Sequence, residues 1–123
     1  MLNIRSTQDL ENHYLNGELF ESMILSDLMK QRYHKGLSSN LYFWRDKSGQ
    51  EVDCILDGTM KKAIEIKSEK TASSTYFSSL VKWNVLSQTN PTDSFVIYGG
   101  SEKQERSQGT LLGWQDSSLL NTD

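Results

Sequence analysis

The stretch that most constrains this chain is Glu51–Lys67, which reads EVDCILDGTMKKAIEIK. It contains two short segments in which apolar side chains alternate with others. Between them lies Asp57-Gly58, a pair typical of a turn because glycine accepts positive φ without steric cost. Alternate side chains of a strand point to opposite faces of its sheet. We therefore predict two adjacent strands, each with one apolar face for a core and one face that carries charge.

The alternation also assigns each side chain of this hairpin to a face. The predicted apolar faces consist of Val52, Cys54, Leu56, Ile64 and Ile66. The opposite faces carry Glu51, Asp53, Ile55, Ala63, Glu65 and Lys67. If the two strands pair, Asp53, Glu65 and Lys67 converge on one side of the sheet. Two carboxylates and an ammonium group in one place suit the binding of a hard divalent cation beside a phosphate.

Size and charge narrow the class of protein. A chain of 123 residues forms one domain with a core, and no apolar run approaches the roughly 20 residues that span a bilayer. Cys54 is the single cysteine, which excludes an internal disulfide and favours a cytoplasmic setting. The net charge of −3 argues against binding nucleic acid by bulk charge alone. Residues 30–70 nevertheless carry a local excess of three positive charges, which fits an anionic substrate or, more commonly, a solvated surface.

The rest of the chain predicts an α+β domain with the element order αβββαβ. We expect residues 1–16 to be an irregular or short helical lead-in from a preceding domain, residues 17–114 the folded domain, and residues 115–123 a loose tail. The expected elements are a helix over 18–33 capped at Asn16-Gly17, strands over 41–45, 51–56 and 63–67, a helix over 75–87, a strand over 94–98 and a short strand over 111–114. A helix between two strands of one sheet makes those strands parallel, so the sheet is mixed and flanked by helices.

Four phrases of the sequence carry a resemblance to a known family. They are GELFES at 17–22, YFWRDKSGQEVDCIL at 42–56, AIEIKS at 63–68 and VIYGG at 96–100. With Asp53 followed by Glu65-Ile66-Lys67, they resemble the PD-(D/E)xK nuclease superfamily, whose restriction-endonuclease-like core is also αβββαβ. The closest likeness is to a nuclease-like domain of unknown function that follows an AAA-type ATPase module in many prokaryotic proteins. The resemblance covers about residues 14–114.

The resemblance implies a metal-dependent phosphodiesterase that cleaves DNA. It implies that Mg²⁺ or Mn²⁺ is bound by Asp53, Glu65, the backbone carbonyl of Ile66, and Glu21 of the first helix. It implies further that Lys67 positions the attacking water and stabilises charge on the phosphate, which is the role of a preorganised cation. The residue before Asp53 is Val52 rather than proline, a common departure in the superfamily. No glycine-rich phosphate-binding loop is present, so ATP binding would belong to the ATPase part of a parent chain.

Each candidate residue also has a plainer interpretation. Glu65 and Lys67 can form a solvated ion pair, Glu21 can complement the helix dipole, and Arg45 can bind either a phosphate or a carboxylate such as Glu51. The tryptophans and Cys54 suit a core. Two other functions therefore remain open: a catalytically silent module that binds nucleic acid or a protein partner, and a structural domain that docks on an ATPase.

Overall fold

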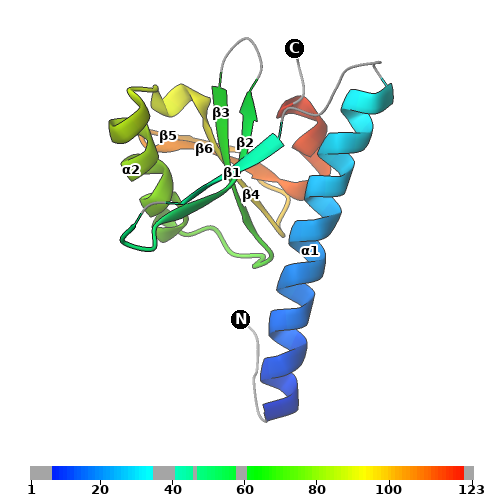
Figure 1. Ribbon diagram of the computed structural model, residues 1–123. Coiled ribbons are helices and arrows are strands. Elements are labelled where there is room, and N and C mark those ends of the chain that lie inside the picture. Colours follow the sequence, from blue (N-terminus) through cyan, green and yellow to red (C-terminus); the bar gives the residue numbers. More distant parts are fainter. Residues whose placement is uncertain (1–6, 35–40, 46, 58–60, 121–123) are drawn as a thin grey trace.

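The chain builds three layers around a mixed β-sheet (Figure 1). The structure, a computed structural model, describes residues 7–34, 41–45, 47–57 and 61–120. Within these residues the elements are α1 (Thr7–His34), β1 (Leu41–Arg45), β2 (Glu51–Asp57), β3 (Lys61–Lys67), the 3₁₀ helix η1 (Ser74–Phe77), α2 (Ser78–Ser87), the 3₁₀ helix η2 (Pro91–Asp93), β4 (Ser94–Tyr98), β5 (Gln104–Arg106), β6 (Gly109–Gly113) and the 3₁₀ helix η3 (Trp114–Leu120).

The sheet has the strand order β1-β2-β3-β4-β6-β5. Strands β1, β2 and β3 pair antiparallel, as tight connections between them require. The connection from β3 to β4 runs through α2, and these strands are parallel. Strand β6 adds a second parallel pair with β4, and β5 closes that edge antiparallel. The predicted α+β class, the mixed sheet and its flanking helices are therefore confirmed.

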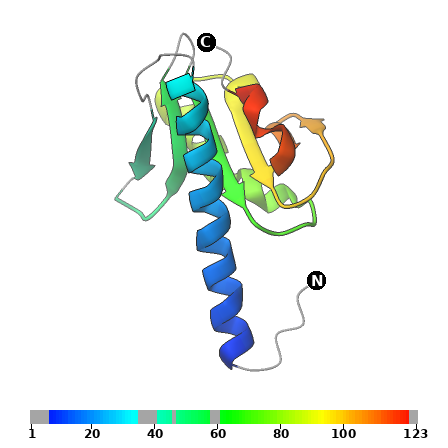
Figure 2. The same cartoon turned by 90° about the vertical axis from the view of Figure 1, so that its right-hand side faces the viewer.

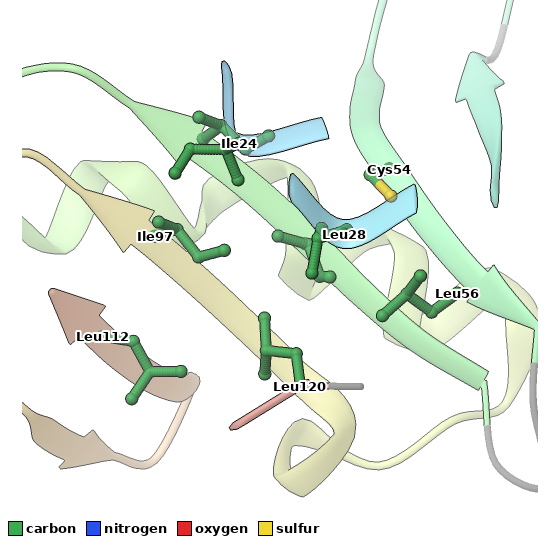
Figure 3. Close-up of a cluster of buried hydrophobic side chains, with 9 residues drawn as sticks. Ile24, Leu28, Cys54, Leu56, Ile97, Leu112 and Leu120 are labelled. Carbon is green, nitrogen blue, oxygen red and sulfur yellow. The ribbon is translucent and has the colours of Figure 1, made fainter. Parts of the chain in front are cut away.

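Helix α1 and η3 cover one face of the sheet (Figures 1 and 2). Ile24 and Leu28, one helical turn apart on α1, are fully buried against strand side chains. The cluster also contains Cys54, Leu56, Ile64, Ile66, Ile97, Leu112 and Leu120, most of which Figure 3 shows around the two α1 residues. The N-terminal turns of α1 extend well past the sheet (Figure 1).

Helix α2 and η1 cover the opposite face. Their apolar side chains Phe77, Leu80 and Trp83 pack on the sheet, where the cluster is completed by Val52, Ile55, Ala63, Val96, Tyr98 and Leu111. Trp44 of β1 contacts Trp83 edge to face, with ring centroids 5.4 Å apart. None of the described helices is both long and apolar enough to cross a membrane.

The structure corrects two predicted boundaries. Helix α1 begins at Thr7 and runs through Asn16-Gly17, which we predicted as its start and as the end of the lead-in. A Cβ atom at Gly17 would lie 3.6 Å from Ser68 Oγ, so the helix passes close to the end of β3 at this position, and tertiary packing outweighs the local cap signal.

The second correction concerns the C-terminal segment. We predicted a loose tail from Gln115, but residues 114–120 form η3. Leu120 is 2% exposed in the α1 cluster, and its carbonyl oxygen accepts a hydrogen bond from Lys62 Nζ at 2.8 Å. Apolar burial at the end of the segment therefore holds it on the sheet. Residues 1–6 of the predicted lead-in and 121–123 of the predicted tail lie outside the described residues.

Candidate active site

The site lies where the backbone pairing of β2 with β3 ends. Their paired residues run from Asp57–Lys61 to Cys54–Ile64, and the next residues along are Asp53 and Glu65. At this point the backbone amides donate hydrogen bonds to side-chain carboxylates instead of to backbone carbonyl groups. The amide of Asp53 donates to Glu65 Oε1 at 3.1 Å, and the amide of Ile66 donates to Asp53 Oδ2 at 2.8 Å. Each carboxylate is thus oriented by a backbone donor of the opposite strand.

A bulge in β2 explains how Asp53 reaches this position. Tyr42 is paired with Ile55 and Trp44 with Val52, so β2 uses three steps where β1 uses two. The additional residue breaks strict alternation. Val52 consequently packs with the α2 cluster, whereas Cys54 packs with the α1 cluster. The prediction that Val52 shares a face with Cys54 and Leu56 was wrong for this reason, and Ile55 is a core residue of the α2 side rather than part of a charged face.

Glu65 is the most perturbed acid of the site. Its side chain is buried, with 5% of the residue exposed. Burial, followed by the negative charge of Asp53, raises the pKa of Glu65 to about 8, although the Asp53 amide and Lys67 oppose the shift. Lys67 Nζ lies 3.8 Å from Glu65 Oε2, and the lysine side chain is 38% exposed, so the ammonium group reaches both the carboxylate and solvent.

Two further carboxylates share this environment. Burial raises the pKa of Asp53, with the Ile66 amide and Lys67 acting in the opposite direction. Burial and the charge of Asp53 raise the pKa of Glu21 on α1. The structure therefore brings together the four residues predicted for the site, from one helix and two strands. Negative charge is in excess there, because three acids face one lysine.

The acids do not form a finished metal cage. Among the described residues, no group of three or more His, Cys, Asp or Glu is arranged to hold a metal ion. The donor chemistry nevertheless fits Mg²⁺ or Mn²⁺, because carboxylate and carbonyl oxygens are the hard ligands that these ions prefer. Burial of neighbouring acids raises the pKa of all three, and a bound cation would relieve this cost of keeping them charged.

A groove gives access to these groups. A cavity of about 390 Å³ lies between α1 and the β1–β2 hairpin, and its walls include Glu21, Phe43, Arg45, Glu51 and Asp53. Neighbouring cavities share its lining residues. One of about 260 Å³ contains Glu21 with Lys67, and one of about 210 Å³ contains Phe43 with Asp53. The candidate site is therefore open along a path that runs beside the edge strand β1.

The remaining candidates are placed as follows. Arg45 binds Glu51, with Nη2 and Nε at 2.8 and 3.1 Å from Glu51 Oε2, so the carboxylate alternative is the one observed. Burial raises the pKa of Cys54 to about 12, so its thiol stays protonated in the core. Trp44, Trp83 and Trp114 pack on the apolar clusters, as predicted. Phe43, 75% exposed in the groove, was not singled out from the sequence.

One protein family matches most of the chain. The match, to a family described as "Domain of unknown function (DUF4143)", covers residues 16–116. The chain belongs to this family. The assignment agrees with the resemblance to a domain of unknown function, and the DUF4143 region contains α2, all six strands and most of α1. A search of the curated proteins and of the solved structures finds no match to the chain.

Proposed function

We propose that this DUF4143 domain is a metal-dependent phosphodiesterase of the PD-(D/E)xK type that cleaves DNA. The observation that carries the proposal is the meeting of Asp53, Glu65 and Lys67 where the β2–β3 pairing ends, with Glu21 across the groove. The αβββαβ order and the pairing of β1 to β4, two antiparallel steps and one parallel step, further support a restriction-endonuclease-like core.

Each residue has a defined part in the proposed reaction. Asp53 and Glu65 would hold the cation with the carbonyl of Ile66, and Glu21 would approach from α1. Asp53 Oδ2 accepts a hydrogen bond from the Ile66 amide, which would hold the carboxylate in place for the cation. When bound, Mg²⁺ or Mn²⁺ would lower the pKa of a coordinated water and withdraw charge from the phosphate. Lys67 would orient that water and stabilise the charge developing on the phosphate oxygens.

The setting of the domain is part of the same proposal. We place it in the cytoplasm, as a module attached to an N-terminal AAA-type ATPase in a larger parent chain. The extension of α1 past the sheet fits such an attachment, because a helix that leaves its own domain has no sheet left to cover there (Figure 2).

The second candidate function is a silent nuclease-fold module that binds nucleic acid or a protein partner. Two observations favour it. The described acids do not form a complete metal cluster, and Arg45 is already held by Glu51. A purely structural role on an ATPase is a weaker alternative, because it gives no reason for three carboxylates to be collected at a cost in desolvation.

The test is cleavage of supercoiled and linear DNA with Mg²⁺ or Mn²⁺. We expect Asp53→Asn and Lys67→Met each to lower the cleavage rate about 100-fold or more. The matched control is Asp57→Asn, an exposed carboxylate at the other end of the same strand, which should cleave like the unmodified protein. Equal cleavage by all four proteins would identify a contaminant and reject the proposal. DNA binding without cleavage would establish the silent module instead.

A further inference from the structure

Phe43 is an aromatic residue that lies largely exposed beside the candidate site. It lies on β1, an edge strand of the sheet, and is 75% exposed. Trp44, the next residue, packs into the α2 cluster and also borders the groove, whereas Phe43 and Arg45 alternate with it along β1 and line the groove with Asp53. The Cα atoms of Phe43 and Arg45 are thus about 7 Å apart along one strand, and both side chains line the groove with the candidate acids Glu21 and Asp53.

The charges of the groove limit how it can bind DNA. Its lining includes the carboxylates of Glu21, Glu51 and Asp53, and Arg45 supplies the opposing positive charge. A duplex held through its phosphates needs an excess of positive charge at the contact surface. Single strands have a second source of affinity, because an unpaired base can stack on an aromatic side chain whatever its sequence. A groove in which three carboxylates outnumber one arginine, with an exposed ring beside them, therefore favours a ligand held by base stacking over one held by its phosphates alone.

We propose that Phe43 is a stacking platform for an unpaired base and that Arg45 binds the adjoining phosphate, so that the site takes single-stranded DNA or DNA unpaired at the cleavage point. This inference rests on the proposed function and names its substrate class. Bases inside a duplex are stacked on each other and do not present a free face. On binding, Arg45 exchanges Glu51 for the phosphate, and the divalent cation offsets the repulsion between the phosphate and the groove carboxylates.

Binding to three DNA ligands of equal length tests the inference. They are a single strand, the same strand with abasic sites at its centre, and the duplex. Fluorescence anisotropy is measured on the 123-residue chain with Ca²⁺, a cation with the same oxygen preference, and intact DNA is verified on a gel. We expect the unmodified protein to bind the single strand about tenfold more tightly than the abasic strand, and more tightly than the duplex.

Two variants and a matched control assign the effect to the ring. Phe43→Ala should abolish the preference for the base-containing strand, and Phe43→Trp should retain it. Val85→Ala is the control, because Val85 is also 75% exposed but lies on α2, on the other side of the sheet. Circular dichroism confirms that each variant is folded.

The outcomes separate this inference from the proposed function. A preference that survives in Phe43→Ala, tighter binding to the duplex, or no binding to any of the three ligands overturns the inference. A Phe43-dependent preference without cleavage in Mg²⁺ supports the platform and rejects the phosphodiesterase. If cleavage depends on Asp53 but not on Phe43, and single-stranded and duplex DNA are cleaved equally, the proposed phosphodiesterase activity stands and the stacking role of Phe43 is rejected.

Discussion

The two faces of the sheet differ in how completely they are packed. On the α2 side, Phe77, Leu80, Val96 and Leu111 are fully buried. On the α1 side, the apolar cluster is also dense around Ile24 (Figure 3), but cavities remain between the helix and the β1–β2 hairpin. Glu21, Asp53 and Lys67 line cavities beside α1.

This difference in packing separates the part of the fold that contributes most to stability from the part that can admit a ligand. A closed apolar face contributes the free energy of burial. The α1 side holds Glu21 and Asp53, and burial raises the pKa of both because it disfavours their charged forms. Perturbed acids beside an open groove are typical of functional sites. We therefore expect substitutions on the two sides to affect stability and activity in opposite ways.

Leu80→Ala should produce the largest loss of stability. Leu80 is fully buried on the α2 side, and removing its side chain leaves a cavity that costs roughly 3–5 kcal/mol of unfolding free energy. Asp53→Asn is the comparison on the α1 side. It keeps an oxygen for the Ile66 amide and removes a charge whose burial is unfavourable, so stability should stay unchanged or rise. Urea denaturation measures both, and an equal loss in both variants would contradict the comparison.

The pH dependence of stability should be the next largest effect. The pKa of Glu65 rises from 4.5 to about 8 on folding, so the folded state binds more protons than the unfolded state between these values. Unfolding free energy should therefore fall as pH rises from about 4.5 to 8, by on the order of 2–4 kcal/mol. Thermal unfolding in a chelator across this range checks it.

Glu65→Gln provides the control for that slope, because glutamine keeps an acceptor for the Asp53 amide and does not titrate. The variant should flatten the profile and be more stable than the unmodified protein at pH 8. If the two profiles run parallel, the titration of another group governs the slope.

The sequence predicted the central part of the fold because its signals are local and strong. Alternation and turn residues located β1, β2 and β3, and the apolar face of the second helix fixed the crossover that makes β3 and β4 parallel. Two weaker signals failed. Asn16-Gly17 resembles a cap but is a helix interior packed near Ser68, and β5, only three polar residues long, has no apolar pattern to reveal it.

The sequence predicted which residues lie close together at the candidate site, but not the strand geometry that brings them there. The sequence predicted that Asp53 and Glu65 converge if their strands pair, and the structure shows both the pairing and the contact. The bulge depends on how β1 pairs with β2, which no local pattern encodes. The exposure of Phe43 could not be predicted for a related reason. The aromatic residues of β1 alternate between the two faces of the strand, but the sequence does not show which face the helices leave uncovered.

The smallest expected effect concerns the ion pair of Arg45 with Glu51 on the groove side. Both side chains are largely exposed, at 74% and 52%, so water and salt screen their attraction. A double-mutant cycle with Arg45→Met and Glu51→Gln should give a coupling energy of about 0.2–1 kcal/mol, which falls further as salt is added. Such a weak pair leaves the guanidinium group available to a phosphate. A coupling well above 1 kcal/mol that persists in high salt would make Arg45 part of the scaffold, and the groove would then lose its contact for the phosphate next to the stacked base.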